Sequence, residues 1–204
     1  MAKNELYFVY NFIEKPVVCP PYKSYVEMWM QTVLYARKNP QFLSTQLHRN
    51  LNPKGTYPIV NHAAFDGKDF EVFRGNSSAG WDDARKTAGV GSTLMHPGGY
   101  TEFGTTTGKP LGPWLPKDDK TTFFLTAFKA SDEKDTKLQE AFEKDWKESS
   151  GTNFILKNAP KELGISNCGL YKKFTERPGL LYVLRSELTG AGVDSEPAKT
   201  FLAQ

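Results

Sequence analysis

Cysteine is scarce in this sequence. The 204 residues include two cysteines, Cys19 and Cys168, one in each half of the chain. Neither belongs to the closely spaced pairs that bind zinc or carry out redox chemistry. We therefore expect no disulfide framework and no metal site.

Long hydrophobic runs are also missing. No stretch approaches the roughly 18 consecutive apolar residues of a membrane helix, and the first residues show no cationic region followed by an apolar run. We therefore expect a cytoplasmic protein without a membrane partner. The sequon at 76–78 is interpreted as a polar loop, because glycosylation requires secretion.

Charge of one sign is not concentrated anywhere. The 26 basic and 23 acidic residues nearly cancel, and neither half contains a basic block, so binding to nucleic acid is not expected. Hydrophobic residues make up 39% of the chain and aromatic residues 13%, which is enough for a folded core. The length suits one large domain or two domains of about 100 residues each.

The first half of the chain has the residue patterns of alternating strands and helices. Segments rich in aromatic and β-branched residues predict strands, and apolar residues at three- and four-residue steps predict helices. The expected elements are a strand at 5–13, a helix at 22–38, strands at 42–48 and 57–65, a helix in two pieces at 68–74 and 81–87, and a strand at 99–103. This β-α-β-β-α-β order is that of a ferredoxin-like fold.

The first of these helices carries a row of apolar residues that predicts its buried face. The members of this row are Tyr22, Val26, Trp29, Met30, Val33 and Leu34. They recur at the three- and four-residue steps of one helical face.

The second half begins with a segment rich in Thr, Gly and Pro, which predicts a linker. The expected organisation is a domain at 1–105, a linker at 106–119 and a second domain at 120–204. In the second domain we expect a strand at 121–129, a helix at 132–147 with Ser131 as N-cap, and strands at 168–174 and 179–188. Gly190, Gly192 and Pro197 interrupt any later pattern, so this β-α-β-β repeat is expected to be incomplete or diverged.

Five strings in the first half occur in the order and at the separations found in one known family. They are Asn11–Pro16 (NFIEKP), Phe42–Arg49 (FLSTQLHR), Leu51–Pro53 (LNP), Tyr57–Asn61 (YPIVN) and His96–Tyr100 (HPGGY). On these strings the first half resembles the antibiotic biosynthesis monooxygenase family. The resemblance implies a ferredoxin-like βαββαβ unit, two of which pair sheet to sheet as an α+β barrel.

We expect the diverged second half to take the place of the second unit. The predicted fold is therefore α+β, with ferredoxin-like repeats that form an α+β barrel as an intramolecular pseudo-dimer. Covalent linkage can raise the effective concentration of the two halves to the millimolar range. The expected state is a monomer with this internal pseudo-dimer, with a homodimer as the alternative.

The resemblance also implies a class of chemistry. Members with known activity oxygenate quinone-like or phenolic aromatics without a metal or flavin, and close relatives bind haem and break its ring. It implies a cofactor-independent monooxygenase-like protein acting on a small aromatic or quinone-type substrate, with haem as a further candidate ligand or substrate. The alternatives are a non-catalytic binding module for haem or another planar hydrophobic ligand, and a purely structural protein, so whether the chain is an enzyme stays open.

Histidines are the first candidates for a base, because imidazole exchanges protons near neutral pH. His48 and His62 lie on two strands of one expected hairpin and are the candidate catalytic bases. The alternative for each is a polar strand residue bonded to its surroundings. His96 precedes Pro97 and Gly98 and is expected to shape the entry to the last strand.

Asn11 is the third catalytic candidate, because it is a polar residue on an otherwise apolar strand face. Haem-degrading relatives have an asparagine here, with a tryptophan and a histidine on the second helix. Phe73 stands where that tryptophan is expected, and no histidine occurs at 81–94, which argues against haem degradation. Trp81, Phe73 and Tyr57 are the candidate substrate-binding residues, since flat rings suit a planar ligand.

Overall fold

The computed structural model describes residues 5–52, 54–76, 78–89, 93–112, 122–176, 179–190 and 195–202. The chain divides into two compact units. Unit 1 comprises Met1–Thr101 and Phe174–Gly179, and unit 2 comprises Glu102–Lys173 and Leu180–Gln204. The predicted linker at 106–119 lies partly outside the described residues, so the predicted domain limits stay predictions.

Unit 1 contains an antiparallel sheet in the strand order β2-β3-β1-β4. Its strands are β1 (Tyr7–Lys15), β2 (Phe42–Arg49), β3 (Ile59–Phe65) and β4 (Leu94–Thr105), of which β4 belongs to this unit up to Thr101. All four strands were predicted from residue type. The last begins at Leu94 rather than at Gly99, because the Pro97–Gly99 segment pairs with β1 instead of forming a turn.

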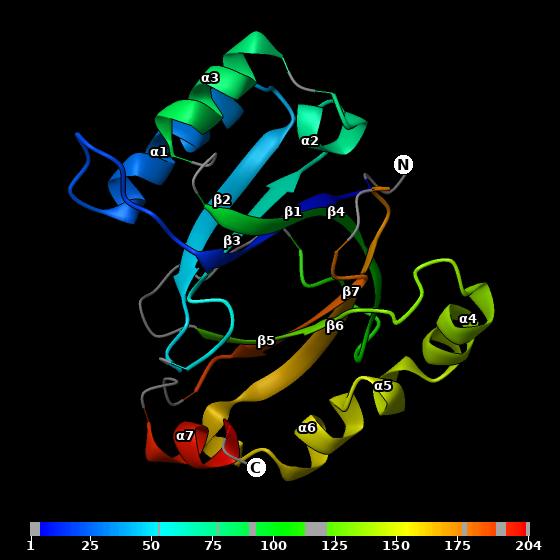
Figure 1. Ribbon diagram of the computed structural model, residues 1–204. Coiled ribbons are helices and arrows are strands. Elements are labelled where there is room, and N and C mark those ends of the chain that lie inside the picture. The colour runs from blue at the N-terminus through cyan, green and yellow to red at the C-terminus, as the bar shows by residue number, and fades with distance from the viewer. Residues whose placement is uncertain are drawn as a thin grey trace. The chain divides into compact units, whose positions relative to one another are not determined.

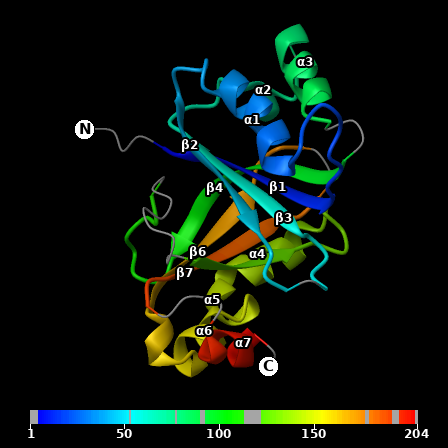
Figure 2. The same cartoon turned by 90° about the vertical axis from the view of Figure 1, so that its left-hand side faces the viewer.

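Three helices cover one face of this sheet (Figures 1 and 2). They are α1 (Tyr25–Ala36), α2 (Glu71–Arg74) and α3 (Ala79–Thr87). The Ser24 hydroxyl caps α1 by accepting from the Glu27 N–H at 3.1 Å, and Ser78 caps α3 in the same way through Trp81. Gly75, with φ of 72°, ends α2 in the left-handed region, which explains why the predicted helix is in two pieces.

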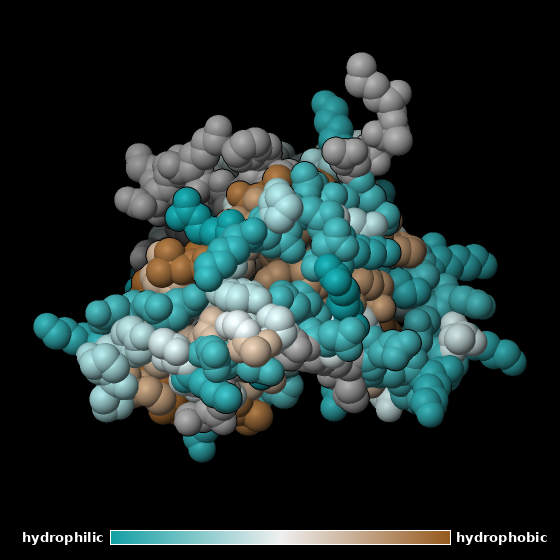
Figure 3. Space-filling model, turned by 90° about the horizontal axis from the view of Figure 1, so that it is seen from above, coloured by the Kyte–Doolittle hydropathy of each residue, from teal (hydrophilic) through white to brown (hydrophobic). Residues whose placement is uncertain are grey.

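The predicted buried face of α1 is partly wrong. Trp29 is buried as expected, whereas Val26, Met30 and Leu34 are 59%, 42% and 51% exposed. The side of α1 that is buried is a neighbouring one. Its buried residues are Tyr25, Met28, Trp29, Thr32 and Ala36. Apolar residues occur on two sides of this helix, and the sequence did not show which side meets the sheet. Figure 3 shows the molecular surface from above, where hydrophobic areas lie between hydrophilic ones.

Unit 2 contains the antiparallel strand order β6-β7-β5. Its strands are β5 (Thr122–Phe128), β6 (Ile165–Lys173) and β7 (Tyr182–Leu188), and its helices are α4 (Thr136–Lys144), α5 (Trp146–Ser149), α6 (Thr152–Asn158) and α7 (Glu196–Leu202), with a 3-10 turn η2 at Lys161–Leu163. The order of β6, β7 and β5 matches that of β2, β3 and β1 in unit 1. A tandem repeat stays a prediction.

Two expectations for unit 2 are corrected by the structure. The N-cap of α4 is Asp135, whose carboxylate accepts from the Leu138 N–H at 3.0 Å, and not Ser131. Helix α7 occupies a stretch that was expected to be irregular because of Pro197. That proline lies in the first turn of α7, where a missing N–H costs no hydrogen bond.

The interior of unit 2 is filled with aromatic and aliphatic side chains. The Phe142 ring stacks on Tyr182 at 4.6 Å and packs against Phe128 at 5.5 Å. Burial, followed by the hydrogen bond to Glu143, raises the pKa of the Tyr182 phenol. Within the described residues, no helix is both long and apolar enough to cross a membrane.

Candidate functional site

A small cavity lies in unit 1 between the sheet and the helices that cover it. Its volume is about 50 Å³. That is about a third of the roughly 150 Å³ of an apolar cavity that holds benzene. On the sheet side it is lined by Val9, Asn11, Phe42, Thr45, Asn61, Ala63 and Phe65. The cavity therefore accepts a ring only if its walls move apart.

The opposite wall comes from the helices and from the segment that leads into α2. Its lining residues are Trp29, Thr32, Val33, Ala36, Phe70, Val72 and Trp81. Neither α2 nor α3 contains a fully buried residue, whereas α1 buries five. We call Phe70, α2 and α3, which together supply Phe70, Val72 and Trp81, the roof of the cavity. Few buried contacts make a segment easier to displace, so the roof is the part that can yield to a ligand.

The Asn11 carboxamide is one of three polar groups on the sheet side of the cavity, with Asn61 and Thr45. It lies on β1, directly opposite Asn61 on β3, and is 9% exposed. Its Nδ2 donates to Asn61 Oδ1 at 2.9 Å. No other partner of this side chain occurs among the described residues, so Asn11 Oδ1 and one N–H stay available to a ligand.

Asn61 is tied to β2 by its own amide group. Its Nδ2 donates to Thr45 Oγ1 at 2.8 Å and to the Gln46 carbonyl at 3.0 Å. The Thr45 hydroxyl in turn donates to the His62 carbonyl at 3.0 Å. This chain of bonds satisfies a buried amide that would otherwise destabilise the sheet.

The cavity lining contains no ionisable side chain. Its polar members are two asparagines, two threonines and two tryptophans, and the others are aliphatic residues and phenylalanines. An amide oxygen is far too weak a base to take a proton near neutral pH. The cavity can therefore orient and desolvate a ligand, but it offers no protein base to it.

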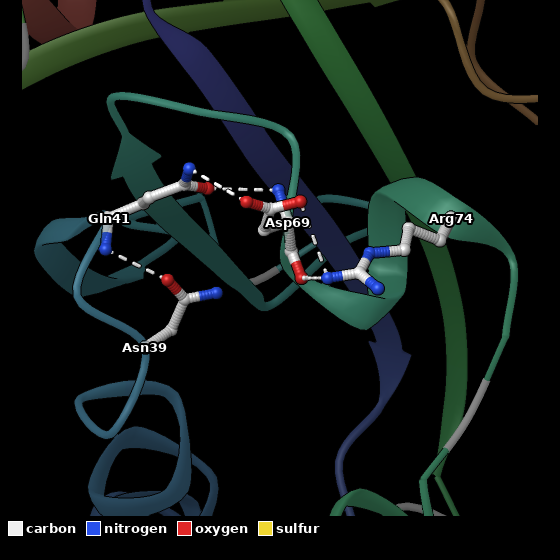
Figure 4. A network of polar contacts seen from close by, with 4 residues as sticks. All are labelled: Asn39, Gln41, Asp69 and Arg74. Atoms are coloured by element: carbon white, nitrogen blue, oxygen red, sulfur yellow. Dashed lines mark hydrogen bonds and ion pairs between the residues drawn. The ribbon is translucent and has the colours of Figure 1, made fainter.

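A polar network holds the start of the roof to β2 (Figure 4). The Gln41 side chain donates to Asp69 Oδ2 at 3.0 Å and accepts from the Asp69 N–H at 2.9 Å. Arg74 donates to the Asp69 carbonyl at 2.6 Å, and Asn39 Oδ1 accepts from the Gln41 N–H at 2.8 Å. Because the Arg74 and Asp69 side chains are 55% and 69% exposed, water weakens their ion pair.

A second group of contacts joins all three helices of unit 1. The Tyr35 hydroxyl on α1 donates to Glu71 Oε1 on α2 at 2.8 Å and lies 2.5 Å from the Ser78 hydroxyl. Ser78 also donates to Glu71 Oε1 at 3.0 Å while it caps α3. We call Tyr35, Glu71 and Ser78 the helix knot, since it connects α1 to both helices of the roof.

The two predicted catalytic histidines lie on the other face of the sheet. Asn61 and Ala63 line the cavity, so the alternation of side chains along a strand directs His62 away from it. The His62 ring is 1% exposed and stacks between Phe8 at 5.6 Å and Tyr10 at 4.7 Å. His48 pairs with Val60 and shares that face. The structure therefore does not bring either histidine together with Asn11.

His96 and Tyr57 form a separate cluster on the face of the sheet that carries Phe12. His96 Nε2 lies 2.9 Å from Glu14 Oε2, and the Tyr57 ring meets the His96 ring edge to face at 5.6 Å and Phe12 at 5.3 Å. Burial, followed by the charge of Glu14, raises the pKa of the Tyr57 phenol. Tyr57, a predicted substrate contact, does not line the cavity.

The other two predicted substrate contacts differ in position. Trp81 lies on the roof and lines the cavity, packed edge to face on Phe70 at 5.1 Å. Phe73 points into an aromatic cluster beside the cavity, 5.3 Å from Phe65 and 5.5 Å from Phe174. Of the six predicted site residues, the structure places Asn11 and Trp81 at the cavity.

Sequence reasoning missed Asn61 and Thr45 as members of the site. Asn61 was visible as a polar residue on a strand that is otherwise apolar around it, the same signal that identified Asn11. What the sequence lacked was the register, which pairs Asn11 with Asn61 and Thr45 with Ala63.

Within the part of the chain that the structure describes, no group of three or more His, Cys, Asp or Glu side chains could hold a metal ion. Cys168 is buried, and burial raises the pKa of its thiol. A buried thiol of this kind is a packing residue rather than a metal ligand.

A protein-family model described as "Domain of unknown function (DUF7153)" matches residues 42–204. Among solved structures, an anthrone oxidase-like protein aligns over 100% of this chain and 79% of its own, with 16% identity and a TM-score of 0.55. A candidate chlorite dismutase aligns over 98% of this chain and 85% of its own, with 12% identity and a TM-score of 0.52. At such identities the likeness shows a shared α+β fold. No curated protein matches the chain in sequence.

Proposed function

The chain belongs to the DUF7153 family, and we propose that it is a cofactor-independent monooxygenase-like protein that acts on a small aromatic or quinone-type molecule in the cavity of unit 1. The observation that carries the proposal is the Asn11 carboxamide, which presents a free acceptor and a free N–H to a cavity walled by Trp29, Trp81 and other apolar side chains. Sites for small planar molecules are apolar, with a few placed polar groups.

The chemistry needs little from the protein. A ring CH₂ that is acidified by a neighbouring carbonyl loses a proton, and the resulting carbanion passes an electron to O₂. The radical pair combines to a hydroperoxide, which loses water to leave a ketone, so that R₂CH₂ and O₂ give R₂C=O and H₂O. The protein contributes by holding the substrate near O₂ and away from bulk water.

The side chains have distinct tasks in this proposal. Asn11 hydrogen-bonds the carbonyl or hydroxyl group of the substrate, and Trp81 and Trp29 hold the ring. Because no ionisable group lines the cavity, the substrate binds uncharged and its proton then passes to a water molecule beside the ring. His48 and His62 are therefore not assigned as the base.

The roof must move for a ring to enter, since the cavity has a volume of only about 50 Å³. Phe70 is buried, but α2 and α3, which carry Val72 and Trp81, contain no buried residue. Closure of such a segment over a substrate is a common way to exclude water.

Oxygen consumption with anthrone as the probe substrate tests the proposal. We expect turnover by the native chain and a loss of at least about tenfold in kcat/KM for Asn11→Leu, which removes one hydrogen bond to the substrate. Asn158→Leu, at an exposed position on α6 in unit 2, is the control and should retain activity. Equal turnover by native protein and Asn11→Leu, or none above the buffer rate, would refute the proposed activity.

A non-catalytic binding module is the second candidate. The lack of any base in the cavity favours it, because binding needs only shape and one polar contact. Saturable binding of anthrone without oxygen uptake would establish it. Haem does not fit this cavity, since its lining holds no His, Cys, Met or Tyr side chain for the iron and no cation for the propionates.

A further inference from the structure

We infer that the cavity recognises an uncharged ligand group that both donates and accepts a hydrogen bond. The Asn11 carboxamide binds this group, and Asn61 fixes the orientation of that carboxamide. This deepens the proposed function, on which it rests in taking the cavity as the ligand site. It adds a specificity-determining residue, Asn61, that touches no ligand itself, and it defines the chemical class of the group that Asn11 binds.

The orientation of Asn61 follows from counting donors and acceptors. The Gln46 carbonyl can only accept, so the group that faces it at 3.0 Å must be the NH₂ of Asn61. Thr45 Oγ1 gives its proton to the His62 carbonyl, so it too accepts from Asn61. Both hydrogens of Asn61 are therefore used on β2, and its oxygen must face Asn11.

The orientation of Asn11 follows in turn. Since Asn61 presents an oxygen, the group of Asn11 at 2.9 Å from it must be the NH₂. The opposite rotamer would set two acceptors against each other in a buried place. Asn11 is thus held with Oδ1 and one N–H free, and a ligand that uses both must offer one donor and one acceptor.

The charge of the ligand is limited by the rest of the cavity. No lining side chain carries a charge that could balance one on the ligand. An anion would also face Asn11 Oδ1, and a cation would face the Asn11 N–H. Burying an uncompensated charge costs several kcal/mol, so the cavity selects a carboxamide or hydroxyl group over a carboxylate or an ammonium group.

Three benzene derivatives of nearly the same shape separate these possibilities. Benzamide both donates and accepts, benzoate only accepts and is anionic, and benzamidinium only donates and is cationic. Isothermal titration calorimetry with the native chain near neutral pH should show benzamide binding at least about tenfold more tightly than either ion. Benzoate or benzamidinium binding as tightly as benzamide, or benzamide not binding at all, would overturn the inference.

A same-size variant tests the role of Asn11 directly. Asn11→Asp places a carboxylate on the cavity floor, so benzamide binding should weaken and benzamidinium binding should strengthen, each by at least about tenfold. Asn158→Asp adds the same charge at an exposed position on α6 in unit 2 and should leave all three affinities unchanged. An unchanged ligand preference in a folded Asn11→Asp chain would contradict the assignment, and if that variant fails to fold the native-chain series still decides.

The role of Asn61 has its own variant. Asn61→Leu leaves Asn11 in place but removes the bond that orients it, so the advantage of benzamide over benzoate should fall by about tenfold or more. An undiminished preference would show that Asn61 only packs. Oxygen uptake with anthrone, measured on the same samples, keeps the two proposals apart: uptake without the ligand preference refutes this inference alone, and the preference without uptake refutes only the oxygenase.

Discussion

The buried pair of Asn11 and Asn61 determines which hydrogen-bonding groups the floor of the cavity presents. Each is less than 10% exposed, and together they present to a mostly apolar cavity an Asn11 oxygen and N–H that have no partner among the described residues. Leaving a buried amide partly unsatisfied costs free energy of about 1 to 3 kcal/mol. A ligand that completes the hydrogen bonds of Asn11 would recover that free energy.

Gly89 is the residue on which the packing of α3 against α1 depends most sharply. Its φ is 62°, and a Cβ there would lie 2.8 Å from Cys19 Sγ and 2.9 Å from Met28 Sδ. Gly89→Ala should lower the free energy of unfolding by about 2 to 4 kcal/mol, from backbone strain and overpacking together. Urea denaturation measures the change.

Gly75→Ala is the matched control for this prediction. Gly75 has a similar φ of 72°, but a Cβ there would meet nothing within 4 Å. Its substitution should cost only the strain of the left-handed backbone, about 1 to 2 kcal/mol. Equal losses for the two variants would show that the sulfur contacts at Gly89 adjust freely.

Tyr25 gives unit 1 a dependence of stability on alkaline pH. Burial raises the pKa of its phenol to about 12 from the ordinary value of 10.0. A raised pKa means that the folded state holds its proton longer, so the stabilisation is complete below pH 10 and is lost as the pH rises to 12. A shift of two units corresponds to about 2 to 3 kcal/mol.

Tyr25→Phe removes this titration. Urea denaturation at several pH values between about 9 and 12 should show a shallower fall in stability for the variant than for the native chain. Tyr22→Phe, at a half-buried position just before α1 in the same cluster, is the control and should fall as steeply as the native chain. The prediction is wrong if the Tyr25→Phe and native curves stay parallel.

What could be predicted at the residue scale depended on whether a residue stands out from its neighbours. Asn11 and Trp81 did, and both line the cavity. The histidines were chosen for their proton chemistry alone, and proton chemistry does not reveal which face of a strand a side chain occupies. His62 and Asn61 are adjacent in the sequence, yet strand alternation puts them on opposite faces of the sheet.

At the scale of elements, two groups of hydrogen bonds attach the roof to the rest of unit 1. The helix knot of Tyr35, Glu71 and Ser78 is half-buried and links α1 to α2 and α3. The network of Gln41, Asp69 and Arg74 is exposed to water (Figure 4). Hydrogen bonds shielded from water hold more strongly than exposed ones, so we expect the helix knot to resist opening of the roof more than the exposed network does.

Tyr35→Phe tests this role by removing one hydroxyl group. The loss of its hydrogen bonds should make opening of the roof easier by about 1 to 2 kcal/mol. Hydrogen exchange of the amides at 71–87 should then quicken by about tenfold or more, while exchange in β1 and β3 stays slow. Tyr22→Phe, whose hydroxyl has no partner among the described residues, is the control. Unchanged exchange at 71–87 would show that other contacts hold the roof.

The elements themselves were largely predictable, and the errors have physical reasons. The strands and α1 followed from residue type and periodicity. Helix α7 was missed because Pro197 was taken as a breaker, although the first helical turn tolerates proline. On α1 both sides carry apolar residues, so periodicity alone did not choose between Met28 and Met30 for burial. That choice is made by the sheet that the helix packs against.

At the scale of the whole molecule, the chain carries two compact αβ units in one polypeptide. Two units in one chain have an effective concentration for each other that can reach the millimolar range, which favours association within the chain over association with a second chain. We therefore predict a monomer: light scattering behind a sizing column should give 22.9 kDa at every loading concentration. If the measured mass is larger, the row of exposed apolar residues on α1 is the first surface to mutate. This row consists of Val26, Met30 and Leu34. A doubled mass would refute the monomer. If Met30→Lys then restores a mass of 22.9 kDa, this row is the interface. If Met30→Lys leaves the mass doubled, the chains pair through another surface.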